Sequence, residues 1–159
     1  MRSLSTDLAL PPRPRTVSLE EARGYPRIFE AEVEPRFIDP MGHMNTMWYV
    51  HLFDRASWSF LASMGVDAAY MKATHSGLFA VEENLRYLGE LRLGDRVEVH
   101  ARLLEIHAKS LRFTLFMVDA THERLAATAE LVGTHVVMEK RRSRPFPEEL
   151  LAGFRSRLR

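Results

Sequence analysis

The stretch from Asp39 to Thr46 combines the residue types that acid–base chemistry needs with the expected start of a helix. Asp39 supplies a carboxylate, and Pro40 and Gly42 mark the next residues as a loop. Asn45 and Thr46 are N-cap candidates, because their side-chain oxygens can accept from the free N–H groups of a first helical turn. An unpaired helix N-terminus also favours a developing negative charge. The stretch therefore predicts a carboxylate followed closely by backbone donors.

The helix that follows should be long and buried. Gly65 is a natural stop, and the residues before it repeat at the spacing of one helical face: Tyr49, Leu52, Phe53, Ala56, Phe60 and Met64. The flank of this face is also apolar, with Met47, Val50, Trp58 and Leu61. Such a helix should be wrapped by protein. Asp54 lies on the same flank, where an ionised group is costly unless it is paired or used.

Composition limits the classes of function. The chain has 159 residues and a net charge of +1, which fits one domain and implies neither nucleic acid nor an anionic membrane as a partner. The absence of cysteine removes disulfides, thiolate catalysis and Cys-ligated metals. No apolar run approaches a membrane span, and the first residues lack the apolar centre of a signal peptide. We therefore expect a cytoplasmic protein without a cofactor.

The order of elements predicts the fold class. Residues 1–17 are Pro-rich and read as a poorly ordered tail, and a capping box at 18–21 starts a short helix. Alternating residues predict a strand over 29–37 before the long helix. A helical turn is expected at 67–71 and a C-terminal helix at 148–158. Four further strands, separated by short turns that favour antiparallel pairing, are expected at 77–88, 96–106, 110–118 and 124–140.

A strand, a long helix and four strands indicate an α+β protein in which one antiparallel sheet curls around the central helix. We divide the chain into an N-terminal tail with a short helix (1–27), the main domain (28–140) and a C-terminal helical tail (141–159). A single sheet leaves part of so apolar a helix uncovered, so a homo-oligomer is expected. The Gly94-Asp95 turn should be scaffold, with Asp95 bonding the neighbouring backbone.

The segment Arg36-Phe37-Ile38-Asp39-Pro40-Met41-Gly42-His43-Met44-Asn45, followed by Tyr49 and Phe53-Asp54, resembles the opening of the hotdog-fold acyl-CoA thioesterases, and most closely the 4-hydroxybenzoyl-CoA thioesterase-like group. Further along, Leu85-Arg86-Tyr87-Leu88 and Leu93-Gly94-Asp95-Arg96-Val97 look like the strand and Gly-Asp turn of that family. The resemblance covers about residues 28–140. It implies a hotdog fold and hydrolysis of an acyl-CoA to free acid and coenzyme A.

The resemblance also implies roles for residues. Asp39 would act as nucleophile or general base, and backbone N–H groups at about residues 45–47 would polarise the substrate carbonyl. His43, Asn45 and Thr46 complete the expected catalytic set, with His43 and Asn45 in positioning roles. No second His lies at ligand spacing from His43, so no metal is expected. Members are typically homodimers or homotetramers with sites between subunits. The residues expected to bind substrate, three of them as partners of the coenzyme A phosphates, are Tyr49, Arg86, Lys109 and Arg112.

Other interpretations stay open at this point. Asp39 could be only a turn residue, and Asp54 or Glu83 could supply a second acid. A hotdog hydratase or dehydratase acting on enoyl or hydroxyacyl thioesters is a second hypothesis. It typically needs Asp-x-Asn-Pro-x-His, whereas the spacing from Asp39 to His43 is one residue shorter and the Asn-Pro is absent. A non-catalytic acyl-CoA-binding subunit is a third hypothesis. The sequence does not identify the acyl group.

Overall fold

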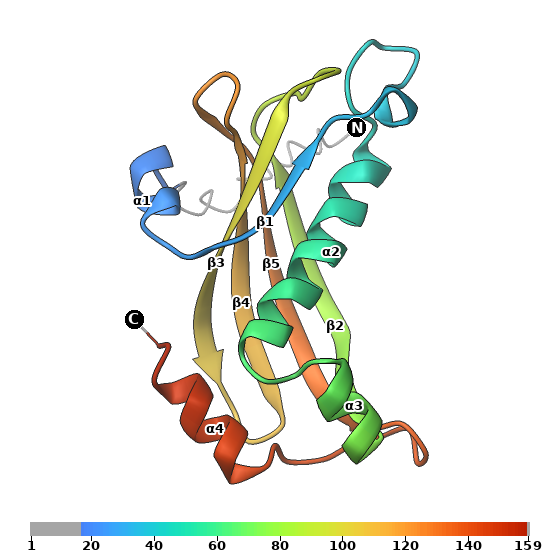
Figure 1. Ribbon diagram of the computed structural model, residues 1–159, viewed down its shortest axis with the longest axis vertical. Helices are drawn as coiled ribbons and strands as arrows, with labels where there is room; N and C mark the ends of the chain where they lie inside the picture. The colour runs from blue at the N-terminus through green and yellow to red at the C-terminus, as the bar shows by residue number, and fades with distance from the viewer. Residues whose placement is uncertain (1–16, 159) are drawn as a thin grey trace, which may run out of the picture.

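A computed structural model of the chain describes residues 17–158. The expectation of a disordered tail falls largely on residues 1–16, which lie outside the described residues. The core of the fold is one antiparallel sheet with the strand order β1-β3-β4-β5-β2, and a short β6 pairs with β5 (Figure 1). The strands are β1 (Arg27–Glu32), β2 (Ser76–Tyr87), β3 (Arg96–Ile106), β4 (Ser110–Asp119), β5 (Arg124–Val137) and β6 (Arg142–Ser143).

Helix α2 (Thr46–Ser63) runs across one face of this curled sheet (Figure 1). The apolar side chains predicted for one helical face are all buried, and Phe53 and Ala56 have no exposed surface. Phe60 packs on Phe113 of β4 with 5.3 Å between the ring centroids. The helix ends where Gly65 takes a φ of +94°, which a residue with a Cβ avoids. The expected arrangement of a sheet around one long helix is confirmed.

Three short helices border the sheet: α1 (Leu19–Arg23), α3 (Ala68–Thr74) and α4 (Glu148–Arg155). The predicted capping residue Ser18 accepts a hydrogen bond from the Glu21 N–H at 3.0 Å, as its position in the sequence implies. On α4, Leu151 and Phe154 are buried, which fixes the C-terminal segment against the domain. Among the described residues, no helix combines the length and apolar character needed to cross a membrane.

Two strand predictions were too long. The strand predicted over 29–37 ends at Glu32, and Pro35–Phe37 form a 3₁₀ turn, because Pro35 cannot donate to a ladder. The strand predicted to reach residue 140 ends at Val137, and Arg141 has a φ of +50° in the turn that follows. That turn returns the chain along β5 as β6, an element that the sequence did not indicate.

The apolar flank of α2 is only partly covered. Leu61 is buried, but Met47, Val50 and Trp58 are exposed, and so is Asp54. The expectation that this flank is wrapped by protein is therefore wrong for the single chain. The reason is geometric: the sheet reaches only one side of the helix, and β2, the strand at the edge of the sheet order, carries its own exposed Phe79 and Val81.

Candidate functional site

The loop before α2 holds Asp39 in a defined position. The Asp39 carboxylate accepts a hydrogen bond from the Met41 N–H at 2.8 Å, and the Asp39 carbonyl accepts one from the Gly42 N–H at 3.0 Å. Gly42 has a φ of +83°, so the turn uses the freedom that glycine provides. The Asp39 side chain is 16% exposed. A partly exposed carboxylate with one oxygen fixed by a backbone amide is pre-oriented but still reachable by a small reactant.

At the start of α2, one backbone N–H makes no hydrogen bond to the described residues. Asn45 is the N-cap, and its side-chain oxygen accepts from the Met47 N–H at 2.9 Å. The Asn45 N–H donates to the Phe37 carbonyl at 2.9 Å, and the Trp48 N–H donates to the Asn45 carbonyl at 3.0 Å. The N–H of Thr46 has no hydrogen-bond partner among residues 17–158. Of the three amides expected to face a substrate carbonyl, two are already used, and Thr46 supplies the free donor.

His43 connects Asp39 to a cavity at the start of α2. Its Nδ1 lies 3.8 Å from an Asp39 carboxylate oxygen and 3.3 Å from the Met44 carbonyl. The ring is 34% exposed and borders a cavity of about 240 Å³. The cavity is lined by His43, Met44, Thr46, Tyr49, Tyr87, Gly89 and Glu90. The structure thus brings together four of the predicted residues, with Thr46 and Tyr49 on one wall and Asp39 behind His43.

Tyr49 has a structural hydroxyl. It is 4% exposed, accepts from the Leu91 N–H at 3.1 Å and donates to the Gly89 carbonyl at 3.2 Å. Its ring meets that of Tyr87 edge to face, with 5.2 Å between the centroids. Both polar contacts of the hydroxyl are therefore satisfied within the chain, and burial raises the pKa of Tyr49.

Sequence reasoning missed the segment after β2 as part of this site. The Met44 N–H donates to the Leu91 carbonyl at 2.7 Å, so residues 89–91 brace both the loop that carries Asp39 and the Tyr49 side chain. Tyr49 and Leu91 lie 42 residues apart, and a tyrosine hydroxyl gives no sign in the sequence of which backbone group it meets. Gly89, in the cavity wall, was the one sign of this site in the segment, because a glycine often marks a place where a ligand or another backbone segment approaches closely.

The second acids lie elsewhere on the molecule. Asp54 borders a separate small cavity between α2 and the strands β2 and β5. Burial raises the pKa of Glu83, and the nearby charge of Asp54 raises it further. Asp54 lies eight residues along the helix from Thr46, or about 12 Å at the usual helical rise, and Glu83 lies on β2. These two carboxylates do not join Asp39 within one chain.

The predicted coenzyme A contacts are dispersed. Arg86 and Arg112 line a cavity of about 360 Å³ with Thr114 and Phe116, which project from β4 opposite the core residue Phe113. The Arg112 guanidinium is paired with Glu130 at 2.6 Å and Glu105 at 3.1 Å. Lys109 lies in the β3–β4 turn. Within one chain the structure does not bring these three cations to the Asp39 loop, so their contact with coenzyme A stays a prediction.

Comparisons with known proteins agree with this architecture. A family model described as Thioesterase-like superfamily matches residues 33–154. A betainyl-CoA thioesterase from Pseudomonas aeruginosa is 32% identical over 124 residues, which are 78% of this chain and 78% of that protein. A Staphylococcus aureus protein solved in complex with CoA has a TM-score of 0.76 and 27% identity, with 85% of this chain and 87% of that chain covered.

A longer relative matches over only part of its length. The L-carnitine dehydrogenase/betainyl-CoA thioesterase of Rhizobium meliloti is 35% identical over 132 residues. This match covers 83% of the present chain but 26% of the relative, so the chain spans about a quarter of that protein. Together with the sheet curled around α2, these likenesses confirm the fold expected from the sequence.

Proposed function

Because the chain belongs to the thioesterase-like superfamily and has its hotdog fold, we propose that it hydrolyses an acyl-CoA thioester to a carboxylic acid and coenzyme A. The observation that carries the assignment of the site is that one short loop holds both the Asp39 carboxylate, fixed by the Met41 N–H, and the free N–H of Thr46 at the start of α2. Thioester hydrolysis needs an oxygen nucleophile and a donor for the developing oxyanion, and this loop offers both.

Two routes use the same residues. In the first, the Asp39 carboxylate attacks the thioester carbonyl carbon, the thiolate of coenzyme A leaves, and water hydrolyses the resulting anhydride. In the second, Asp39 takes a proton from water as the water oxygen attacks the same carbon. In both routes, charge develops on the carbonyl oxygen, where the Thr46 N–H stabilises it. The C–S bond breaks, one proton of the hydrolytic water ends on the thiolate of coenzyme A, and Asp39 is left ionised again. His43, whose Nδ1 lies 3.8 Å from an Asp39 carboxylate oxygen, lines the cavity on the side of the loop.

The acyl group that we propose to test first is the betainyl group. Betainyl-CoA thioesterase is the printed activity of the Pseudomonas aeruginosa relative, whose length this chain largely spans. The cavity of about 240 Å³ beside Thr46 suits a small acyl group better than a long chain. We further propose that the protein acts in the cytoplasm on this class of coenzyme A thioester.

We propose that the working form is a homodimer or a homotetramer. The support is the exposed apolar surface along α2 and the β2 edge, where Met47 is 60% and Val81 62% exposed. An edge strand with unpaired N–H and C=O groups is a template for pairing with a second copy. Sedimentation should show an oligomer, and Val81→Lys should shift it toward monomer. A stable wild-type monomer at micromolar concentration would contradict this proposal.

The test of the catalytic assignment compares two matched substitutions in a coenzyme A release assay with a panel of acyl-CoAs. Asp39→Asn keeps the shape of the side chain but removes its basicity, so kcat should fall roughly 10²–10⁴-fold. KM should change little, because coenzyme A is held by other parts of the surface. Asp54→Asn is the control and should be the milder lesion, since Asp54 lies away from the loop.

The same assay separates the competing functions. A hydratase would change the enoyl chromophore without releasing thiol, and a binding subunit would do neither. If Asp39→Asn kept wild-type turnover while Asp54→Asn abolished it, the catalytic acid would lie on the helix. In that case the assignment of Asp39 would be wrong, although the hydrolase activity would stand.

A further inference from the structure

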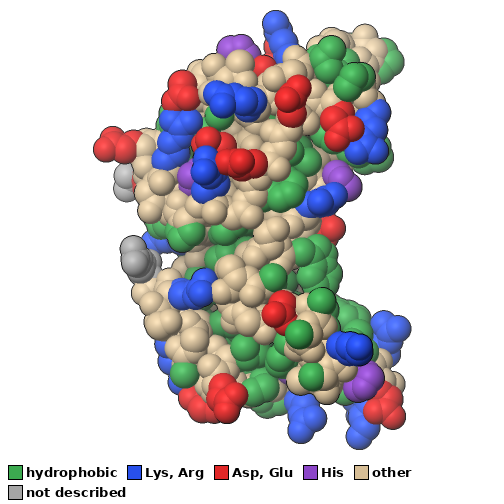
Figure 2. Space-filling model, viewed as in Figure 1, with side chains coloured by type: hydrophobic (Ala, Val, Ile, Leu, Met, Phe, Trp, Pro, Cys, Tyr) green, Lys and Arg blue, Asp and Glu red, His purple; other side chains and the backbone are tan. Residues whose placement is uncertain are grey.

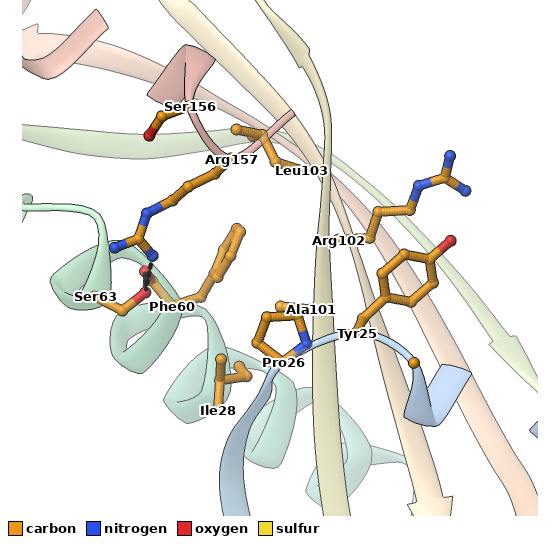
Figure 3. Close-up of a pocket in the computed structure, with 11 residues that line it drawn as sticks. Tyr25, Pro26, Ile28, Phe60, Ser63, Ala101, Arg102, Leu103, Ser156 and Arg157 are labelled. Atoms are coloured by element: carbon orange, nitrogen blue, oxygen red, sulfur yellow. Dashed lines mark hydrogen bonds between the residues drawn. The ribbon is translucent and has the colours of Figure 1, made fainter. Parts of the chain in front are cut away.

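Another cavity, larger than the one beside Thr46, lies at the other end of α2. It has a volume of about 410 Å³, within the range of small-molecule sites. Four segments meet around it: the link from α1 to β1, the last turn of α2, the middle of β3 and the residues after α4 (Figure 3). On the face drawn in Figure 2, the surface narrows to a waist between the α1 region and the C-terminal segment, with hydrophobic side chains along it.

This cavity is separate from the Asp39 loop. Ser63, on its wall, is the last residue of α2, whereas Thr46 is the first. Seventeen residues of helical rise place them about 25 Å apart. No residue that borders the cavity beside Thr46 also borders this one. Whatever binds here therefore does so without touching the proposed catalytic groups.

The walls are mainly apolar. Phe60 forms one side, with Ile28 and Leu103 facing it, and Pro26 and Ala101 complete the surface (Figure 3). An unfilled apolar space forfeits the packing contacts that its lining could make. A ligand with a hydrocarbon body would recover those contacts and remove the lining from water.

The charge in this cavity is positive. Its lining includes Arg102 and Arg157 but no acidic side chain among the described residues. The Arg102 guanidinium stacks over the Tyr25 ring at 5.3 Å and points away from the cavity, so it does not present its charge there (Figure 3). Arg157 reaches across the cavity to Phe60 and Ser63 (Figure 3).

The Arg157 guanidinium makes a weak hydrogen bond within the chain. Its Nη1 donates to the Ser63 hydroxyl at 3.4 Å, a long hydrogen bond, while that hydroxyl itself donates to the Phe60 carbonyl at 2.6 Å. No carboxylate among residues 17–158 lies within ion-pair distance of Arg157. The neighbouring Arg155, by contrast, is paired with Glu148 at 2.6 Å. A guanidinium with free donors beside an apolar surface is suited to bind a carboxylate through two parallel hydrogen bonds.

We infer that this cavity is a binding site for a monocarboxylate with an apolar chain, in which Arg157 binds the head group and the Phe60–Leu103 walls hold the chain. The hydrocarbon fills the space between the helix and β3, and the carboxylate replaces Ser63 as the partner of Arg157. A cationic ligand is disfavoured because the described residues of the lining carry no negative charge. The inference does not depend on the proposed hydrolase activity, because the site and its test involve binding alone.

The experiment is calorimetric titration of the full-length protein with decanoate below its micellar concentration. Two further titrations test the chain and the carboxylate separately: decan-1-ol retains the hydrocarbon chain without the charge, and acetate retains the charge without the long chain. Saturable binding of decanoate is expected, with much weaker binding of either comparison compound. Arg157→Gln should weaken decanoate binding roughly 10- to 100-fold, the range that corresponds to loss of a hydrogen-bonded charged partner.

Arg155→Gln is the matched control, because it removes the same charge two residues away without touching the cavity, and it should bind decanoate as the wild type does. Ala101→Leu narrows the cavity from the β3 side and should also weaken binding. If Ala101→Leu does not fold, Arg157→Gln still decides the matter. Equal affinity of wild type and Arg157→Gln, or the absence of saturable binding, would overturn the inference.

Discussion

The hydroxyl of Tyr49 provides a direct test of whether this residue is part of the scaffold or of the substrate site. Tyr49→Phe removes one oxygen and leaves the ring against Tyr87. The Leu91 N–H and the Gly89 carbonyl then both lose their hydrogen-bond partner. Each net hydrogen bond contributes about 0.5–1.5 kcal/mol, so the variant should lose roughly 1–3 kcal/mol of stability. For a chain of this size, each kcal/mol lowers Tm by about 2–4 °C.

Thermal unfolding and steady-state kinetics on the same samples test this prediction. Tyr87→Phe is the matched control: Tyr87 is 48% exposed, and no hydrogen bond of its hydroxyl occurs among residues 17–158. Its Tm should stay within the small range typical of surface substitutions. If Tyr49→Phe kept the wild-type Tm but raised KM, the hydroxyl would bind substrate and its structural role would be wrong.

Two further predictions concern the turn regions at the ends of β3 and β4. Asp95→Ala should lower the free energy of unfolding by about 1–3 kcal/mol and leave kcat of the folded protein nearly intact, because the buried Asp95 carboxylate accepts the Arg92 N–H at 2.8 Å. Urea unfolding with kinetics checks this, and a selective loss of kcat would count against it. Burial by itself would raise the pKa of Asp119, but hydrogen bonds from His122 and Arg124 outweigh it, and the pKa is lowered. The contribution of the Asp119 carboxylate to the free energy of unfolding should therefore be complete above about pH 4 and be lost as the pH falls through the lowered pKa. A urea midpoint of Asp119→Asn that is as sensitive to acid as that of wild type would contradict this prediction.

The features predicted from the sequence are those set by local chemistry. Asn45 caps α2 and Ser18 caps α1 because capping depends on residues only two or three positions away. The buried face of α2 follows from the helical period, and Gly65 ends the helix through its own backbone freedom. The loop from Asp39 to Thr46 belongs to the same class, which is why the expected carboxylate and helix start lie together.

The features that were not predicted depend on contacts between residues far apart in the sequence. The partner of Tyr49 lies 42 residues away, and the ion pairs of Arg112 with Glu130 and Glu105 follow from strand register. The exposure of Asp54 also could not be read from the helical pattern, because it depends on how far the sheet extends around α2. A one-residue change in register would exchange the faces of a strand, and the sequence of that strand alone does not fix its partners.

The strand order has a consequence for the growing chain during synthesis. The β3–β4–β5 part of the sheet is built from neighbours in sequence, but among residues 17–158 the one strand that pairs with β2 is β5, and Ser76 lies opposite Val137. About 60 residues must therefore be added after the start of β2 before its pairing can be completed, which takes roughly 3–12 s at 5–20 residues per second. During that interval α2 and β2 have no complete sheet to cover them. We expect arrested nascent chains that end before residue 124 to be cut by protease within α2, and chains in which residue 159 has left the ribosome to resist cleavage there.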